Sequence, residues 1–98
     1  MSRERLANRR PAEVIGFFHG NRRWTLTVGR FPDGRAAELF LDGAKVDPLS
    51  ELAQESAIVA SLALQSGCGL DTLRHALTGH GEGPLAAGLA LIERRTTT

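Results

Sequence analysis

The stretch DPLSELAQESAIVASLALQSG, residues 47–67, decides the fold, because no other segment of the 98-residue chain is long and apolar enough to form the centre of its core. Asp47 suits the N-cap of a helix, and Pro48 suits the first turn, where its missing N–H has no partner to lose. Apolar residues then follow helical spacing on one face, which we expect to meet a sheet. They are Leu49, Leu52, Ala53, Ala57, Ala60 and Leu64.

Two further residues of this segment, Ile58 and Leu62, project from the opposite side of the predicted helix. Beyond Ser56 the helix is therefore apolar nearly all the way round, which is typical of a helix that is buried on two sides. Either the C-terminal segments of the same chain or another subunit must cover the second side. We expect Ile58 and Leu62 to take part in dimer or inter-helix packing.

The residues ahead of this helix have the pattern of three antiparallel strands. Residues 13–19 are rich in β-branched and aromatic side chains, and turn chemistry follows at residues 19–21. Residues 22–30 alternate apolar and polar side chains, and the Phe-Pro-Asp-Gly turn at residues 31–34 separates them from a third alternating run, residues 35–41. The sequence thus predicts a three-stranded meander.

After the long helix, the Gly-Cys-Gly break at residues 67–69 predicts a helix end. A shorter helix is expected over residues 70–78, then a flexible loop over residues 78–83, and a last helix that opens at Pro84. We therefore expect a single α+β domain, residues 13–95. A three-stranded antiparallel sheet is covered on one face by the long central helix, two shorter C-terminal helices pack against it, and residues 1–12 form a flexible basic arm.

The net charge of +1 conceals a strong asymmetry along the chain. Residues 1–35 carry eight arginines against three acidic residues, a net charge of +5, whereas residues 36–98 carry four basic and eight acidic residues, a net charge of −4. Such a split favours contact with nucleic acid or an acidic partner, or head-to-tail self-association, and it is also compatible with a solvated arginine-rich surface. The residues that we expect to contact a partner are Arg9, Arg10, Arg22, Arg23, Arg35 and Lys45.

The sequence offers no constellation that would support catalysis or hold a cofactor. The single cysteine, Cys68, excludes an internal disulfide and supplies too few thiolates for a structural zinc site. Its spacing to His75 and His80 matches no metal motif, and no serine lies in a Gly-x-Ser-x-Gly turn. We therefore predict no catalytic, metal or cofactor-binding residue, and a protein that is not an enzyme.

The sequence also bears on location and on binding of nucleic acid. The N-terminus has no apolar region of the signal-peptide type, and with one cysteine the chain fits a reducing compartment, so we expect a cytoplasmic protein without membrane contact.

The rings of Trp24, Phe17, Phe18 and Phe40 could stack on bases from a sheet face. Against this, no aromatic-rich RNA-recognition signature is present, and a small core needs most of these rings.

A series of short motifs follows a recognisable order over about residues 9–92. The motifs are Trp24-Thr25-Leu26-Thr27-Val28-Gly29, Asp33-Gly34-Arg35, Glu38-Leu39-Phe40-Leu41, Gly43-Ala44-Lys45, Ser61-Leu62-Ala63-Leu64-Gln65-Ser66-Gly67 and residues 73–79. This order resembles the TSCPD-type domain, which occurs at the C-terminus of adenosylcobalamin-dependent ribonucleotide reductases and in short stand-alone proteins of bacteria and their phages. The earlier Arg9-Arg10-Pro11 also resembles the stand-alone members.

The chain departs from that family at two points. Val46-Asp47-Pro48 follows Lys45, where the family commonly has a glycine and a small hydroxyl residue, and the cysteine-bearing motif that names the domain is absent. The radical chemistry and the cobalamin site of the reductase belong to its large barrel domain. The resemblance therefore implies an accessory module without that activity.

These observations favour a non-catalytic accessory module that binds a protein partner and can form a homodimer. The alternative is an inhibitor carried by a phage or mobile element, for example of the anti-CRISPR type, which would bind a nucleic acid or a nucleoprotein complex. Basic residues would carry nucleic-acid contact, whereas Glu51, Glu55 and Asp71 would carry contact with a protein subunit. A small enzyme that binds a nucleotide is a third hypothesis, which thermal stabilisation by the ligand would test.

Overall fold

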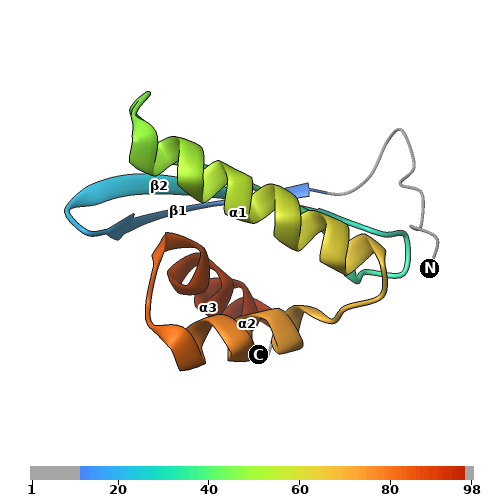
Figure 1. Ribbon diagram of the computed structural model, residues 1–98. Helices are drawn as coiled ribbons and strands as arrows, with labels where there is room; N and C mark the ends of the chain where they lie inside the picture. The colour runs from blue at the N-terminus through green and yellow to red at the C-terminus, as the bar shows by residue number, and fades with distance from the viewer. Residues whose placement is uncertain (1–11, 97–98) are drawn as a thin grey trace.

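The computed structural model describes residues 12–96, and it has the predicted α+β architecture (Figure 1). The elements, in chain order, are β1 (Ala12–His19), β2 (Arg22–Arg30), β3 (Ala36–Asp42), α1 (Pro48–Gln65), α2 (Leu70–His80) and α3 (Pro84–Thr96). The expected basic arm lies outside the described residues, apart from Ala12, which opens β1. The predicted meander and the long central helix are both confirmed.

The strands form one antiparallel sheet in the order β1-β2-β3, with β2 in the centre. Leu26 of β2 stands opposite Ile15 of β1 and Leu41 of β3, so the apolar residues of all three strands share one face. The tight turn between β1 and β2 requires positive φ at both of its residues, Gly20 and Asn21 (φ 60° each). Glycine and asparagine are the residue types that adopt this conformation at low cost.

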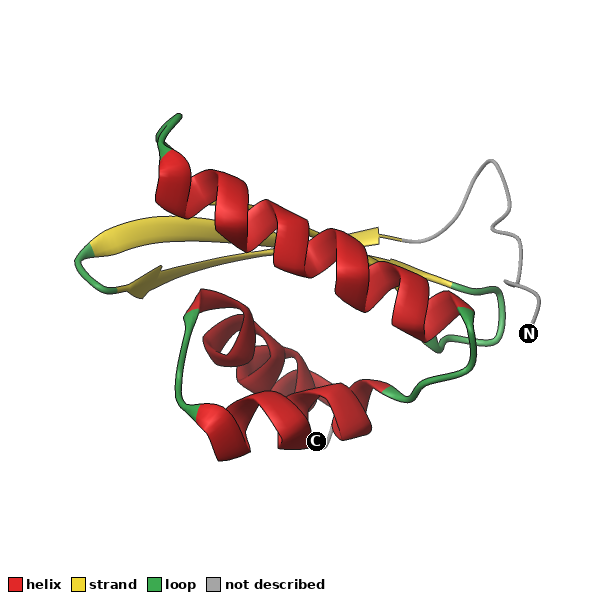
Figure 2. Cartoon of the chain, viewed as in Figure 1, coloured by secondary structure: helices red, strands yellow, loops and turns green. Residues whose placement is uncertain are grey.

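The core lies between that sheet face and the helices α1 and α3, and α2 lies beside α3 on the same side of the sheet (Figure 2). Its α1 side is built largely of alanine, which lets the helix axis come close to the strands. Gly88 does the same for α3, because a Cβ there would lie 2.9 Å from Leu26 Cδ2. The principal buried side chains are Ile15, Phe17, Trp24, Leu26, Val28, Leu39, Leu41, Ala53, Ala57, Ala60, Leu64, Leu85, Leu89 and Ile92.

The polar side of α1 closes the outer edge of β3. The side chain of Gln54 accepts the Leu41 N–H at 2.8 Å, the Ser61 hydroxyl accepts the Leu39 N–H at 2.8 Å, and Gln65 donates to the Ala37 carbonyl at 3.0 Å. As the helix advances from residue 54 to residue 65, its strand partners run back from residue 41 to residue 37. The helix therefore lies antiparallel to β3 and satisfies backbone groups that an edge strand would otherwise leave unpaired.

Two expectations about the helices are wrong in detail. Leu49 and Leu52 do not meet the sheet but are exposed, because α1 is rotated so that Ser61 and Gln65 are buried at the β3 edge in their place. The loop expected from Thr78 begins later, since α2 continues to His80. Of the two covers considered for the second side of α1, the C-terminal helices do not provide one, because α3 packs on the sheet beside α1.

Candidate interaction surface

Large aliphatic side chains remain exposed on the side of α1 that faces away from the sheet. Leu52 is 63% exposed, Val59 67%, Ile58 49% and Leu62 43%. Residues 52, 55, 59 and 62 follow the i, i+3, i+7, i+10 spacing by which one helix packs along another, and Glu55 is the one charged member. We call Leu52, Glu55, Ile58, Val59 and Leu62 the outer face of α1. No residue described in the chain buries it.

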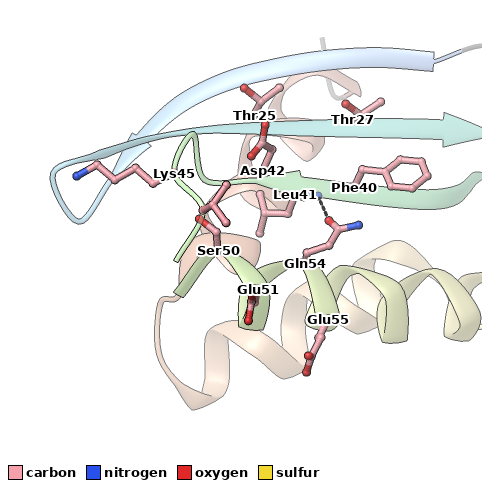
Figure 3. Close-up of a pocket in the computed structure, with 11 residues that line it drawn as sticks. Thr25, Thr27, Phe40, Leu41, Asp42, Lys45, Ser50, Glu51, Gln54 and Glu55 are labelled. Atoms are coloured by element: carbon pink, nitrogen blue, oxygen red, sulfur yellow. Dashed lines mark hydrogen bonds between the residues drawn. The ribbon is translucent and has the colours of Figure 1, made fainter. Parts of the chain in front are cut away.

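A groove of about 640 Å³ runs beside the outer face. It lies between the first turns of α1 and the face of β3 that is turned away from the helices (Figure 3). Its polar rim carries Asp42, Lys45, Glu51 and Glu55, so acidic groups outnumber the single basic one. On its other side the rim shares Glu55 with the outer face. The surface that continues from the outer face into this groove is therefore apolar with an acidic border.

A second groove, of about 490 Å³, lies on the opposite side of α1, where the helix faces the connection between α2 and α3. Leu49 and Leu52 line it together with Leu77 and Leu85. Leu52 thus belongs both to this groove and to the outer face. The exposed apolar side chains of α1 therefore extend from this groove, through Leu52, onto the outer face, where Glu55 lies among them.

The sheet face turned away from the helices carries a second group of exposed side chains. Phe18 is 73% exposed and Phe40 44%, and the guanidinium carbon of Arg23 lies 5.6 Å from the centre of the Phe18 ring. Thr25 and Thr27 lie between them on β2. Of the four rings considered from the sequence, Trp24 and Phe17 lie in the core, whereas Phe18 and Phe40 remain outside it, so the core takes up two of these rings rather than most of them.

Arg22, one of the predicted partner-contact residues, makes contacts within its own chain. Its Nη1 donates to Asp47 Oδ1 at 2.9 Å and to Ser50 Oγ at 3.0 Å, and its Nη2 donates to Asp47 Oδ2. The guanidinium also lies 5.5 Å from the centre of the Trp24 ring. Gly43 is required beneath this cluster, because a Cβ there would lie 2.9 Å from Trp24. The bidentate pair ties β2 to the start of α1.

Asp47 in this cluster is also the N-cap of α1, where it accepts the Ser50 N–H at 2.9 Å. Hydrogen bonds from the Arg22 side chain, and then from the Ser50 backbone, lower the pKa of Asp47 far below its usual value. A carboxylate whose pKa is lower in the folded than in the unfolded chain stabilises the fold above the unfolded pKa of about 3.9, and this stabilisation is lost as the pH falls below that value.

We expect Asp47→Asn to lower the urea midpoint of unfolding at pH 7 and to make it less sensitive to acid. The difference in midpoint between the native chain and the variant should shrink as the pH falls from 5 to about 2.5, because Asp47 of the unfolded native chain then takes up a proton and the advantage of the ionised carboxylate in the fold is lost, whereas asparagine does not titrate. Urea titrations followed by circular dichroism at four pH values measure this difference. A difference that stays constant to the lowest pH would contradict the assigned role of the carboxylate.

The remaining predicted contact residues do not form one cluster. Arg23 lies on the exposed sheet face, Lys45 lies in the loop before α1, and Arg35 follows the turn at the other end of β2 and β3. The Arg35 guanidinium binds Asp33 at 2.7 Å and lies 4.7 Å from the centre of the Phe31 ring. Arg9 and Arg10 lie outside the described residues, and they stay predictions.

Chemistry-bearing side chains are dispersed in the described part of the chain. Cys68 lies in the break between α1 and α2, His19 at the end of β1 and His75 on the exposed side of α2. No three His, Cys, Asp or Glu side chains among those that the structure describes gather as metal ligands would, and the side chain of His80 lies outside that set. In the same range, none of the helices combines the length and the apolarity needed to cross a lipid bilayer.

Comparison of the chain with protein-family models, with curated proteins and with solved structures finds no match. The resemblance to the TSCPD-type domain therefore rests on the motifs of this sequence alone.

Proposed function

We propose that the chain is a non-catalytic protein-interaction module whose partner docks on the outer face of α1. One observation carries the proposal: Leu52, Ile58, Val59 and Leu62 stay exposed on one helix side although the core beneath that helix is complete. Single exposed apolar residues are common on protein surfaces, but a continuous group of them marks an interaction site. Four such residues within about three turns of one helix are a group of this kind.

The chemistry of the surface specifies the partner. The helical spacing of residues 52, 55, 59 and 62 fits a second helix lying along α1, and the Glu51 and Glu55 carboxylates favour basic residues on that helix. The partner is therefore an amphipathic helix with an apolar stripe bordered by lysine or arginine. An accessory role beside a larger enzyme agrees with the resemblance to the TSCPD-type domain, and we propose the cytoplasm as the location, since a lone cysteine requires no oxidising compartment.

We expect Val59→Arg to abolish binding of the partner without unfolding the chain, because Val59 is two-thirds exposed and its new charge would face basic residues. The matched control is Ala76→Arg, which adds the same charge at an exposed position of α2. Each protein is immobilised, exposed to lysate from the native host, and its retained proteins are identified by mass spectrometry.

The outcome is judged by comparing the three samples. A protein that the native chain and Ala76→Arg retain, and Val59→Arg loses, supports the proposed docking face. If Val59→Arg retains the same proteins as the native chain, the outer face of α1 is not the docking site. Circular dichroism of each variant confirms that a lost partner does not reflect a lost fold.

The second candidate is nucleic-acid binding on the exposed sheet face, and the exposed rings of Phe18 and Phe40 with Arg23 favour it. Binding of this kind weakens steeply with salt, because the arginine displaces counterions from phosphates. An electrophoretic shift of single-stranded DNA or RNA that disappears in Phe18→Ala/Arg23→Glu would support this candidate. A shift that is equal for both proteins, or absent for both, would count against it.

A further inference from the structure

The backbone groups at one edge of the sheet bind to α1, whereas those at the other edge do not. At the β3 edge, Gln54, Ser61 and Gln65 of α1 bind the outward backbone groups. At the β1 edge, no comparable cover is present among the described residues, and the strand has eight residues without an internal proline or lysine. Long uncovered edges of this kind pair readily with another strand, so natural proteins usually block them.

The register identifies which groups of β1 point outward. Successive residues of a strand turn their N–H and C=O groups to alternate sides. The backbone N–H and C=O of Leu39 point toward α1. The same groups of the next residue, Phe40, therefore point toward β2, where Thr27 stands opposite. The backbone groups of Thr27 bond to β3 and so cannot also bond to β1. Val14, which stands opposite Thr27 on β1, therefore points its backbone N–H and C=O away from the sheet.

By the same alternation, Gly16 and Phe18 also present their N–H and C=O groups at the open edge. No side chain or loop within residues 12–96 makes a hydrogen bond to these groups. The side chains of Val14 and Phe18 stand on the exposed sheet face next to that edge, 61% and 73% exposed. The edge thus combines unpaired backbone groups with uncovered apolar side chains.

We propose that β1 pairs antiparallel with β1 of a second copy of this chain, about a two-fold axis that passes through Gly16. The residues that pair across this edge are those whose N–H and C=O point outward. Gly16 therefore stands opposite Gly16 of the second copy, and Val14 stands opposite the second copy's Phe18. Each facing pair of outward residues exchanges two N–H···O bonds. The two three-stranded sheets join into one six-stranded sheet.

A second copy fits this edge because β1 is complementary to itself in that register. The small Val14 side chain meets the large Phe18 ring on the exposed face, in both halves of the pair. On the helix-covered face, Glu13 stands opposite the second copy's His19 in this register, and the Glu13 carboxylate keeps its bond from Arg30 Nη2 (2.6 Å) within its own chain. Gly16, on the axis, has no side chain to collide with its counterpart. A two-fold interface requires self-complementarity of this kind.

This dimer goes beyond the proposed function and does not depend on it. The sheet edge that pairs lies across the sheet from β3 and α1, so each copy keeps the outer face of α1 free for its partner. Ile58 and Leu62, which the sequence had suggested for dimer packing, are then assigned to the partner surface. The dimer would present two such surfaces and would bind a two-fold target with increased avidity.

Light scattering on matched double variants tests both the dimer and its register. The native chain is expected to show twice the mass of one 98-residue chain. Val14→Lys/Phe18→Lys places lysine opposite lysine and should give the mass of one chain, whereas Val14→Lys/Phe18→Glu places lysine opposite glutamate and should remain dimeric. Both residues are exposed, and circular dichroism confirms that each variant is folded.

Each contrary result overturns a defined part of the proposal. A native chain that is monomeric at the highest concentration at which it stays in solution excludes the dimer. A dimer that survives Val14→Lys/Phe18→Lys but dissociates in Ile58→Lys places the interface on α1 instead. Equal masses for the two double variants would exclude the register in which residue 14 faces residue 18. The outcome is independent of the partner capture by the outer face of α1, so the two proposals fail separately.

Disulfide trapping gives a second readout that does not require a charged variant. In a Cys68→Ser background, Gly16→Cys on the two-fold axis should cross-link to itself under mild oxidation, since facing Cα atoms of a hydrogen-bonded pair lie about 5.5 Å apart. A Cβ at residue 16 would approach only the mobile end of Arg23, at 3.1 Å, which can move away. Val14→Cys is the control and should not cross-link to itself. Equal cross-linking of both would contradict the axis at Gly16.

Discussion

Replacing Trp24 by alanine is expected to lower the free energy of unfolding by about 3–5 kcal/mol, the range observed when a large buried aromatic side chain is removed. Trp24 is 1% exposed near the start of β2, and its indole N–H donates to the His19 carbonyl at 3.1 Å. The ring packs against Gly43, which has no side chain that could extend into the space. A domain of this size has a total stability of about 5–15 kcal/mol, so the loss is a large share of it.

Urea unfolding followed by far-ultraviolet circular dichroism measures this effect, because Trp24 is the only tryptophan and its fluorescence is lost in the variant. The matched control is Phe40→Ala, which removes an aromatic ring from a half-exposed position on the opposite sheet face. We expect the control to cost about 1 kcal/mol. Equal losses for the two variants would mean that Trp24 is not at the centre of the core.

Ser61→Ala is expected to lower the free energy of unfolding by about 1–3 kcal/mol, because the Leu39 N–H would then be buried without an acceptor. The Ser61 hydroxyl accepts that N–H at 2.8 Å, and it donates to a carbonyl, with Ala57 O at 2.8 Å and Leu39 O at 3.1 Å both in reach. Alanine has the higher helix propensity, so any loss of stability must come from these contacts.

The control for this prediction is Ser56→Ala on the same helix. Ser56 is exposed, and its hydroxyl donates only to the Ala53 carbonyl one turn back, so its removal should change the stability by less than about 0.5 kcal/mol. Hydrogen exchange of the Leu39 amide gives the local readout, and it should accelerate in Ser61→Ala alone. A Leu39 amide that exchanges at the native rate in Ser61→Ala would contradict the assigned hydrogen bond.

The order of the elements could be predicted from the sequence because each element follows a local rule. Period-two alternation marks β2, the Phe-Pro-Asp-Gly turn separates it from β3, and Asp47-Pro48 opens α1 with the N-cap geometry that was expected. Turn chemistry and capping depend on residues that are neighbours in the chain. These features therefore need no knowledge of what packs where.

The rotation of α1 could not be predicted by the same rules. Hydrophobic spacing alone directed Leu49 and Leu52 toward the sheet, whereas the structure exposes both and buries Ser61 and Gln65. The deciding interaction is long-range, since the free edge of β3 needs hydrogen-bond partners and α1 supplies them. The sequence carries a signal for this: Gln54, Ser61 and Gln65 repeat along one side of an otherwise apolar helix at seven- and four-residue spacing.

The surface residues were predicted with similar limits. Ile58 and Leu62 were recognised because they broke the one-sided pattern of a surface helix, but Val59 was missed and so were the open edge of β1 and the exposed rings on the sheet. The prediction of the arginines rests on their charge alone. Charge does not reveal which guanidinium pairs within its own chain, as Arg22 does with Asp47.

The three hydrogen bonds from α1 to β3 also fix the angle at which the helix is held about its own axis. A rotation of α1 about its axis in either direction would break the hydrogen bonds to the β3 backbone. Val59 and Leu62 therefore keep one orientation. A ligand that binds there meets a rigid template and loses little affinity to the ordering of the receptor. The polar contacts between α1 and β3 thereby also hold the apolar outer face of α1 in a fixed orientation for binding.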